Sequence, residues 1–504
     1  MNKKTLLLFL FILTNCILFA KQVDVNYAEK VASNFLAGKI KVRSNTGLSL
    51  KLVHTAKSES KLRSTGEETA YFYIFNIGNN NGFVIVSADD INRPILGYSF
   101  KGHFDMERIP DSLKDWMKNV ELNMAHAISN GLEQPEIVKK KWNTYSSNPS
   151  DSGPGGSGGE GQQGSGDFLI KSTWDQDEPF ENSLPVLESG IQRPAAGCVA
   201  IAIGQIMKYY NYPTRGLKPT EAYWSKKYPS TISTFIPSID LTKHIYDWNN
   251  ILLEYKYKYI QNPDGTVNRY PNYTQYQAKA VADLIFHIGA SSKMSYGNSS
   301  SAPTIYAARA LVEYFGYDNA INVIKRRYYS DQEWINIIKN EINNRRPVYV
   351  EGWTESGSGH AFICDGYDPD GLFHINLGWG GYVDGYFSID DPLRYSLDQQ
   401  IIINIKPGNG TRNFEDTTLS LDESISNNPE ISIFPNPVKD VLNITSLKGD
   451  IKQIILMDLM GKVVLVEDIN ESEKSIPVQH LPQNMYILKV NTSKGQSIFK
   501  INKE

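Results

Sequence analysis

The chain has 504 residues, of which 41% are hydrophobic and 21% charged, so it is long and apolar enough to bury the cores of several domains. A formal net charge of −4, without a concentrated basic stretch, argues against nucleic acid as a partner. The three cysteines, Cys16, Cys198 and Cys364, are too few for a disulfide framework, so packing must supply the stability.

The N-terminal residues 1–20 have the features of a signal peptide. Lys3 and Lys4 precede an apolar run over residues 6–13, and Ala20 offers a small residue for cleavage. No other stretch reaches the roughly 20 apolar residues that a membrane-spanning helix needs. We therefore expect an exported protein without a membrane span.

Residues 21–145 are predicted to form an α+β domain. The apolar residues of 27–36 and 111–131 have helical spacing. Residues 70–77 and 83–87 are β-rich and are joined by GNNNG, which is typical of a hairpin turn.

A Gly/Ser-rich linker follows at residues 146–167, with the sequence SSNPSDSGPGGSGGEGQQGSGD. It has no large apolar side chain to bury, so we expect it to be disordered and open to proteolysis. If the chain is a zymogen, the activation cleavage belongs in this linker or just after it.

Residues 168–407 are predicted to form a second α+β domain with two lobes. Its first half has helical patterns at residues 198–210, 273–288 and 302–315. Its second half is β-rich, with apolar runs at residues 348–352, 361–367, 372–377, 385–389 and 400–405. A helical lobe beside a β lobe predicts a cleft between them.

The C-terminal part of the chain is predicted to be a second linker, residues 408–428, and a small β-sandwich, residues 429–504. The opening FPNPVKDVLNI and the terminal YILKV and FKI resemble the C-terminal sorting domain of the type IX secretion pathway of Bacteroidetes. This resemblance implies that the secretion machinery is a partner and that the protein passes through the periplasm to the medium or the cell surface. A carbohydrate- or protein-binding sandwich is the alternative.

Cys198 is a candidate nucleophile. It opens the apolar helical run CVAIAIGQIMKYY, directly after the small residues of 195–197. In the first turn of a helix, unpaired N–H groups and the positive end of the dipole stabilise a thiolate and lower the thiol pKa. The alternative is that Cys198 is a small apolar residue in a buried helix.

A thiolate nucleophile needs an imidazole that accepts and returns a proton, and the imidazole needs a group that holds its ring. His360, Asn376 and Trp379 follow Cys198 in chain order, which is the papain-type arrangement. Asn376 either accepts a hydrogen bond from His360 or caps a turn. Trp379 either shields the imidazole from water or fills the core.

Three stretches, GCVAIAIGQIMKYYNYP, GHAFICDGYD and HINLGWGG, resemble the streptopain family of secreted bacterial cysteine peptidases. The resemblance extends over residues 25–405. It implies a papain-like fold in which Cys198 and His360 form a thiolate–imidazolium pair, and it assigns the family's Asn and Trp to Asn376 and Trp379.

The same resemblance implies further roles. The string GFVIVSADDINRPILGYS resembles the family's propeptide, so residues 21–145 are expected to be an inhibitory prodomain; an independent adhesive domain is the alternative. Gln192 matches the oxyanion glutamine by its spacing from the cysteine, and a surface glutamine is the alternative. The family's contacts to the substrate backbone map to Gly359 and, across a one-residue gap, to Ser301. Leu377 stands where the family commonly has tryptophan, which leaves that part of the cleft wall undefined.

We expect no metal and no cofactor. The string DGYDPDG lacks the spacing of a calcium loop, and His374 has no cysteine or carboxylate partner at zinc spacing. Cys364 lies within an apolar strand pattern and is predicted to be a buried, inert thiol.

Together these features predict an exported cysteine endopeptidase that is made as a zymogen. The expected architecture is α+β, with a papain-like two-lobed domain between an α+β prodomain and a β-sandwich. We expect a monomer that hydrolyses proteins and peptides through an acyl-enzyme. The alternatives are a papain-like acyltransferase or transglutaminase, since the sequence does not reveal the acyl acceptor, and a catalytically inactive surface-binding protein.

Overall fold

The computed structural model describes most of the chain, and the chain divides into two compact units, Met1–Gln162 and Gln163–Glu504. The predicted signal peptide, most of the first linker and nearly all of the second lie outside the described residues. The described residues are 21–39, 49–58, 69–107, 111–146, 164–165, 167–186, 193–226, 233–262, 264–297, 299–353, 359–389, 397–408, 431–446, 450–458, 463–492 and 495–504.

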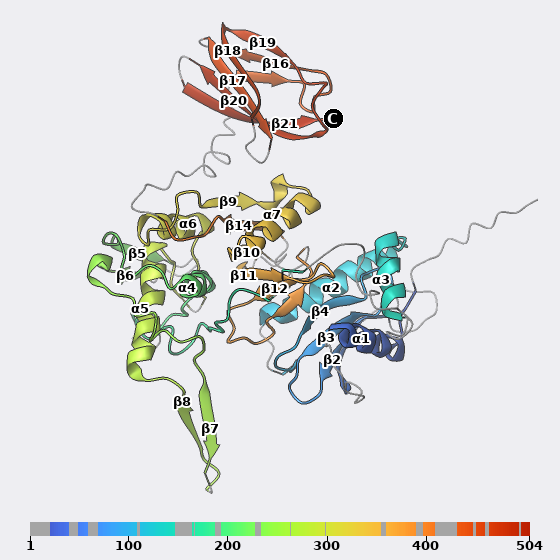
Figure 1. Cartoon of the computed structure of the whole chain (residues 1–504), viewed down its shortest axis with the longest axis vertical. Coiled ribbons are helices and arrows are strands. Elements are labelled where there is room, and N and C mark those ends of the chain that lie inside the picture. The colour runs from blue at the N-terminus through green and yellow to red at the C-terminus, as the bar shows by residue number, and fades with distance from the viewer. Residues whose placement is uncertain are drawn as a thin grey trace, which may run out of the picture. The chain divides into compact units, whose positions relative to one another are not determined.

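An antiparallel meander forms the centre of the first unit (Figure 1). Its strands are β1 (Leu50–Lys57), β2 (Ala70–Ile77), β3 (Phe83–Ser87) and β4 (Ile95–Ser99), and its helices are α1 (Val25–Lys39), α2 (Asp111–Ser129) and α3 (Glu136–Ser146). All residues of β2 are buried, so both of its faces are covered, and α1 and α2 both contact it. The helices and strands predicted for this part of the chain are confirmed, and β1, β4 and α3 are additional.

Helix α4 (Cys198–Tyr210) is the central element of the second unit. It packs against helices α5 (Gln275–Ser291) and α6 (Thr304–Glu313) and against strand β11 (Gly359–Tyr367). Residues 199–207 are therefore buried without exception, which explains why their sequence is apolar on every face.

The other helices of this unit differ in how they begin. Thr274 caps α5 and Ser330 caps α7 (Asp331–Asn343), each in a capping box. Helix α6 has no such side-chain cap of its own, because its N-cap residue is Pro303. Short 3-10 turns occur at η1 (Leu241–Lys243) and η2 (Arg326–Tyr328).

The β lobe is an antiparallel sheet in which neighbours pair in the order β13–β12–β11–β10–β14–β9. Strand β11 lies inside this sheet, and all of its residues except Gly359 are buried. The strands predicted from the apolar runs are confirmed, and β9 was not predicted. Their bounds are β9 (Asn322–Lys325), β10 (Val348–Trp353), β12 (Phe373–Asn376), β13 (Gly385–Phe387) and β14 (Leu397–Ile403).

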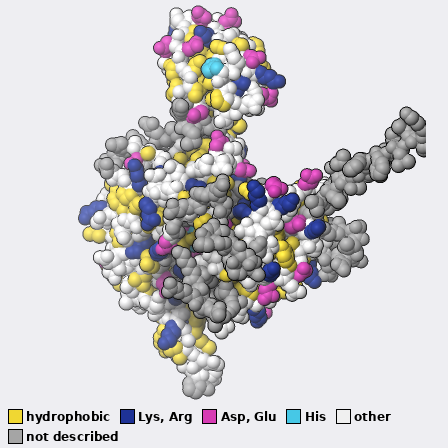
Figure 2. Space-filling model, turned by 45° about the vertical axis from the view of Figure 1, so that its right-hand side comes forward, with side chains coloured by type: hydrophobic (Ala, Val, Ile, Leu, Met, Phe, Trp, Pro, Cys, Tyr) yellow, Lys and Arg dark blue, Asp and Glu magenta, His cyan; other side chains and the backbone are white. Residues whose placement is uncertain are grey.

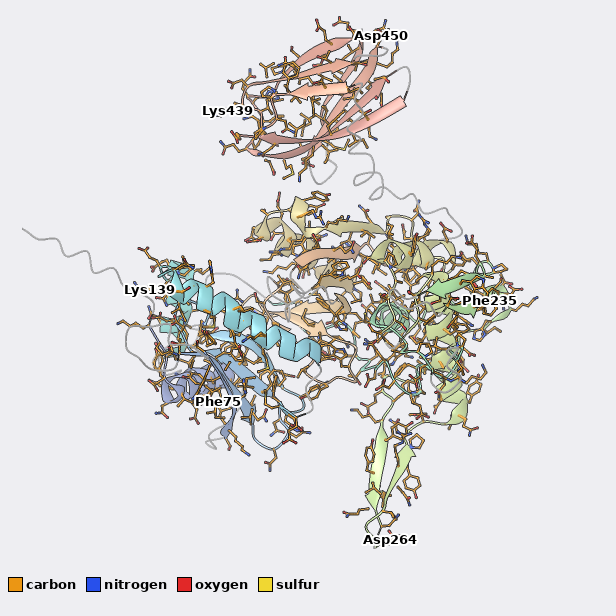
Figure 3. The ribbon with its side chains drawn as sticks, turned by 180° about the vertical axis from the view of Figure 1, so that it is seen from behind. Phe75, Lys139, Phe235, Asp264, Lys439 and Asp450 are labelled. Atoms are coloured by element: carbon orange, nitrogen blue, oxygen red, sulfur yellow. The ribbon has the colours of Figure 1, made fainter. Side chains whose placement is uncertain are left out.

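The helical lobe contains more β-structure than we predicted. Strands β5 (Tyr223–Lys226) and β6 (Ser233–Ile236) form one hairpin, and β7 (Tyr257–Gln261) and β8 (Val267–Pro271) form another, which projects from the lobe (Figure 1). The hairpins lie at the surface, where Phe235 and Asp264 mark their positions (Figure 3). Every residue of β8 is exposed, so this strand has no buried face that would impose an alternating apolar pattern on the sequence.

The C-terminal region forms the predicted β-sandwich. One sheet has the order β15–β16–β19 and the other has the order β18–β17–β20–β21. Buried aliphatic side chains from both sheets, such as Leu442, Ile454 and Leu488, share one core. The strands are β15 (Ile431–Phe434), β16 (Val441–Ser446), β17 (Ile451–Asp458), β18 (Val463–Glu471), β19 (Glu473–Pro477), β20 (Asn484–Thr492) and β21 (Gly495–Lys503).

The hydropathy of the helices and the charges on the surface can also be read from the structure. Within the part of the chain that the structure describes, no helix is long and apolar enough to span a bilayer. Lys and Arg side chains are interspersed with Asp and Glu over the coloured surface in Figure 2.

The close packing of α4 against α5 generates a prediction about stability. A Cβ atom on Gly204 would lie 2.8 Å from Ile285 Cδ1 and 2.9 Å from Trp174 Cζ3. We expect Gly204→Val to lower the free energy of unfolding by about 1–3 kcal/mol through overpacking. Urea unfolding followed by tryptophan fluorescence measures the loss. The matched control is Gly38→Val in α1, where a Cβ would meet nothing within 4 Å; equal losses in both variants would contradict the prediction.

Candidate active site

Cys198 is the first residue of α4, and the turn before it requires glycine. Gly197 has a φ of 89°, which is a left-handed conformation that other residues rarely adopt. A Cβ atom at this position would also lie 2.8 Å from Met294 Sδ and 3.1 Å from Ser300 Cβ. The small residues before Cys198 therefore form a tight turn that lies against Met294 and Ser300.

The electrostatic environment of Cys198 differs from the one we predicted. Backbone N–H groups of Val199 and of Cys198 itself, at the start of the helix, lower the pKa of the thiol, as does the N–H of Ala361 on β11. Burial acts in the opposite direction and is the larger effect, so the pKa of Cys198 is raised to about 11. The expected depressed pKa is therefore wrong for this structure, because desolvation outweighs the helix terminus.

His360 lies on β11, directly before Ala361, and is buried. Its Nε2 atom lies 2.9 Å from the carbonyl oxygen of Leu377. Because a carbonyl only accepts hydrogen bonds, Nε2 carries the proton, and Nδ1 of the neutral ring keeps a lone pair. Burial lowers the pKa of His360 to about 4, although the hydrogen bond to Leu377 acts in the opposite direction.

Aromatic rings lie next to the imidazole of His360. The Trp379 ring has its centroid 4.9 Å away at an interplanar angle of 31°, and the Phe362 ring lies 6.2 Å away at 22°. Trp379 is itself only partly buried, so it lies between the imidazole and the surface rather than deep in the core. The shielding of His360 by Trp379, the first of the two roles predicted for it, stays a prediction.

Asn376 caps a turn, which is the second of the two roles predicted for it. Its Oδ1 atom accepts hydrogen bonds from the N–H of Gly378 (3.1 Å) and from Gln205 Nε2 (2.8 Å), and its Nδ2 atom donates to the carbonyl of Ser172 (2.9 Å). The acceptor for His360 is thus the backbone of Leu377 and not the side chain of Asn376. The alternative in which Asn376 accepts from His360 is corrected accordingly.

The Leu377 peptide is held on both sides. Its N–H donates to Asp384 Oδ1 at 2.9 Å, and the residues before and after it, Asn376 and Gly378, are joined by the turn hydrogen bond. The Leu377 side chain is buried, so it fills core at the position that the sequence left undefined.

Gln205 is a site residue that the sequence analysis missed. It is buried in α4, where its Oε1 atom accepts a hydrogen bond from Ser172 Oγ at 2.9 Å while Nε2 donates to Asn376. Helix α4 is thereby joined to the turn whose Leu377 carbonyl contacts His360. The available signal was a lone amide side chain within an otherwise apolar, fully buried helical run.

Three predicted residues remain, Ser301, Gly359 and Gln192, and the structure describes the first two. Ser301 is exposed and forms an antiparallel bridge with Ser295, in the loop that touches Gly197. Gly359 is exposed at the start of β11, where a Cβ would lie 2.9 Å from Nε1 of Trp353. Gln192 lies outside the described residues.

His374 has a carboxylate partner, contrary to our expectation of a lone imidazole. Its Nδ1 atom lies 2.6 Å from Asp365 Oδ1, and both side chains are buried. The other carboxylate oxygen accepts the N–H of Ile170 at 2.6 Å, and the Phe168 ring stacks on the imidazole at 3.9 Å. The pair anchors the start of the second unit. Among the described residues, no group of three His, Cys, Asp or Glu side chains is arranged to hold a metal.

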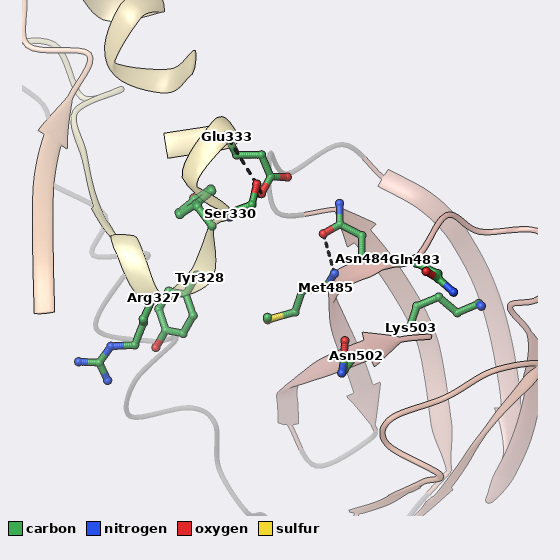
Figure 4. A pocket seen from close by; sticks show the side chains of 10 residues that line it. Arg327, Tyr328, Ser330, Glu333, Gln483, Asn484, Met485, Asn502 and Lys503 are labelled. Carbon is green, nitrogen blue, oxygen red and sulfur yellow. Dashed lines mark hydrogen bonds between the residues drawn. The ribbon is translucent and has the colours of Figure 1, made fainter. Parts of the chain in front are cut away.

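Two other features lie apart from this arrangement. Cys364 is fully buried and its pKa is raised well above the usual value by burial, in agreement with the predicted buried thiol. A pocket of about 390 Å³ in the second unit contains none of the predicted site residues (Figure 4); it is lined by Arg327, Tyr328, Tyr329, Ser330, Glu333, Gln483, Asn484, Met485, Asn502 and Lys503.

Family models match three parts of the chain. The peptidase C10 family matches residues 174–387, the Spi protease inhibitor matches residues 20–124, and a secretion system C-terminal sorting domain matches residues 432–504. The sorting domain indicates secretion to the medium or the cell surface, as we predicted.

Individual relatives agree with these matches. The thiol protease/hemagglutinin PrtT of Porphyromonas gingivalis is 31% identical over 400 residues, which are 77% of this chain but only 42% of that protein. Streptopain of Streptococcus pyogenes is 34% identical over 335 residues, 63% of this chain and 73% of streptopain. A solved fragment of prointerpain A from Prevotella intermedia superposes with a TM-score of 0.51 at 26% identity, covering 72% of this chain and all of the fragment. The chain therefore belongs to the streptopain family of cysteine peptidases, the peptidase C10 family, and has its papain-like fold.

Proposed function

We propose that this protein is a secreted cysteine endopeptidase made as a zymogen, with Cys198 as nucleophile and His360 as general acid and base. The observation that carries the proposal is the packing of the start of α4 against β11: Cys198 packs against the core to which Ala361 belongs, and the backbone N–H of Ala361 lowers the pKa of the thiol. It joins the start of α4 to the strand residue that directly follows His360. Membership of the C10 family supports the same assignment.

In the proposed reaction, the Cys198 thiolate attacks the carbonyl carbon of a peptide bond while the imidazole of His360 holds the proton. His360 then protonates the leaving amine, which departs, and an acyl-enzyme remains. Water, deprotonated by His360, hydrolyses the thioester and restores the thiol. No cofactor is required for any of these steps.

Other residues bind the substrate and stabilise charge in this proposal. The backbone N–H of Cys198 and the side chain of Gln192 donate hydrogen bonds to the oxyanion. Gly359 and Ser301 contact the substrate backbone; both are exposed in the structure, which supports access to them.

Asn376 acts in this proposal as a positioning residue rather than as a direct partner of the imidazole. Its hydrogen bonds to Gly378 and Gln205 hold the turn in which the Leu377 carbonyl faces His360 Nε2. An oriented carbonyl keeps the proton on Nε2 and so leaves Nδ1 as the atom that exchanges a proton with the thiol.

The charge states support latency of the uncut chain. With a pKa of about 11 for Cys198 and about 4 for His360, both groups are neutral at pH 7 in this structure. Proton transfer from sulfur to imidazole needs the two groups close enough for their opposite charges to offset desolvation. We assign residues 21–145 as the inhibitory prodomain, in line with the match to the Spi protease inhibitor over residues 20–124.

The first test concerns the nucleophile. We expect Cys198→Ala to lower kcat/KM for a protein substrate by at least about 10⁴-fold, because the covalent step is lost. Cys364→Ala is the matched control; it should keep nearly full activity at a stability cost of about 1 kcal/mol for a small cavity. Substantial hydrolysis by Cys198→Ala would reject this nucleophile. Product analysis with an added amine distinguishes hydrolysis from acyl transfer.

The second test concerns Asn376. We expect Asn376→Ala to lower kcat by more than about tenfold with little change in KM, because the Leu377 carbonyl loses its support, and to destabilise the fold by about 1–3 kcal/mol. The control is Asn343→Ala, which removes the acceptor of the Tyr367 hydroxyl on the same domain and should cost stability alone. An unchanged kcat in Asn376→Ala would show that the turn does not position His360.

The third test concerns latency and its pH dependence. A pKa of about 11 leaves roughly one Cys198 thiol in 10⁴ ionised at pH 7, and this fraction rises tenfold for each pH unit. Iodoacetamide should therefore label Cys198 slowly in the uncut chain near pH 7 and much faster near pH 11, while the trimmed enzyme reacts rapidly already near pH 7. Peptide mass spectrometry measures the labelling, with buried Cys364 as the internal control. Rapid labelling of the uncut chain at pH 7 would contradict the prediction.

A further inference from the structure

A buried carboxyl group lies on β10, the strand that pairs with the strand carrying His360. Glu351 is on β10, only 8% exposed, and directly opposite Ala361 in the pairing of β10 with β11. Ala361 belongs to the core against which Cys198 packs, and its backbone N–H lowers the pKa of the Cys198 thiol. The carboxyl group is thus one strand away from the residue that contacts the thiol, and its negative charge acts on the thiol to raise the pKa.

Glu351 also connects three elements of the domain. Its Oε2 atom accepts a hydrogen bond from Thr304 Oγ1, at the first residue of α6, and another from Gln400 Nε2 on β14 at 3.1 Å. Pro303 offers no side-chain cap to α6, and Glu351 instead holds the first residue of the helix to β10 through the hydroxyl of Thr304. The carboxyl group therefore fixes the start of α6, three residues beyond Ser301, against the β lobe.

Among the described residues, the groups that face Glu351 carry no positive charge. They are the thiol of Cys198 on α4, the hydroxyl of Thr304 on α6, the amide of Gln400 on β14 and the phenol of Tyr349 on β10 itself. Without a positive partner, burial dominates and raises the pKa of Glu351 to about 8. The carboxyl group is hence mostly protonated at neutral pH and loses its proton as the pH rises through 8.

We propose that Glu351 is a positioning residue for the nucleophile, which holds α6 against β10 and sets an alkaline limit on the reactivity of Cys198. Below that limit the Glu351 carboxyl is neutral and does not raise the pKa of the Cys198 thiol. Above it, a carboxylate and a thiolate lie close together in a medium of low dielectric constant, where like charges repel strongly. The two groups then titrate as a coupled pair, and the thiol keeps its proton to higher pH. This inference rests on the proposed function of Cys198.

The test is the substitution Glu351→Gln, since glutamine accepts the same two hydrogen bonds through its amide oxygen but cannot ionise. Iodoacetamide labelling of Cys198 in the full-length chain is followed by peptide mass spectrometry from pH 6 to pH 11. We expect equal rates for wild type and variant below pH 7. Above pH 8 the variant profile should lie about one pH unit lower, which is about tenfold faster labelling at a given pH.

The matched control is Glu313→Gln, which removes a carboxylate at the other end of α6, where it pairs with Lys218. Its labelling profile should equal that of wild type. Identical profiles for Glu351→Gln and wild type would overturn the inference. A rate change of the same size at every pH would overturn it too, because that pattern reports a structural effect without a titrating charge.

A second variant keeps the inference testable if Glu351→Gln does not fold. Thr304→Val removes one hydrogen-bond donor to the Glu351 carboxylate, which disfavours its charged form. The change of slope that we expect near pH 8 in the plot of labelling rate against pH should therefore move to higher pH. If the pH at which the labelling profile changes slope is the same in Thr304→Val as in wild type, the assignment to Glu351 is wrong. Labelling reports the thiol and not peptide hydrolysis, so this result stands apart from the activity of Cys198→Ala, on which the proposed function depends.

Discussion

Helix α4 packs against strand β11, and the arrangement of the site depends on this contact. The helix places Cys198 at its first residue, after a glycine turn that no side chain can replace. The strand places His360 directly before Ala361, whose backbone N–H lowers the pKa of the Cys198 thiol. The apolar face of α4 and the neighbouring side chains of β10 and β11 belong to one core, so a change in that packing would move nucleophile and base relative to each other.

The second layer of the site is polar and buried. Gln205, Asn376 and Ser172 form a closed set of hydrogen bonds, in which the Ser172 hydroxyl donates to Gln205, Gln205 donates to Asn376, and Asn376 donates to the Ser172 carbonyl. In a medium of low dielectric constant such a set is costly to break, because each group left unpaired keeps its full desolvation penalty. The turn that presents the Leu377 carbonyl to His360 is therefore held by the same interactions that join the two lobes.

Two opposite effects set the pKa of the Cys198 thiol: backbone N–H groups lower it, and burial raises it by more. Backbone N–H groups around Cys198 favour a thiolate, yet the surrounding apolar atoms keep the thiol, the imidazole of His360 and the carboxyl of Glu351 neutral at pH 7. The same low dielectric constant strengthens a thiolate–imidazolium pair once the two groups meet.

The sequence alone was enough to predict the three parts of the chain that the family models match and most of the helices and strands, because these follow from local apolar spacing and from contiguous motifs. The sequence also singled out Cys198, His360 and Trp379 as candidate site residues, and their roles stay proposals. It missed the hairpin β7–β8, whose residues are solvated and so are under no pressure to alternate. Only the tertiary structure decided that the partner of His360 is the Leu377 carbonyl, since every residue carries a carbonyl and side-chain identity does not reveal which one is presented. It also decided the direction of the pKa shifts and the position of Glu351 behind Cys198. These depend on desolvation and on the pairing of distant segments, and neither is encoded in any short stretch of the chain.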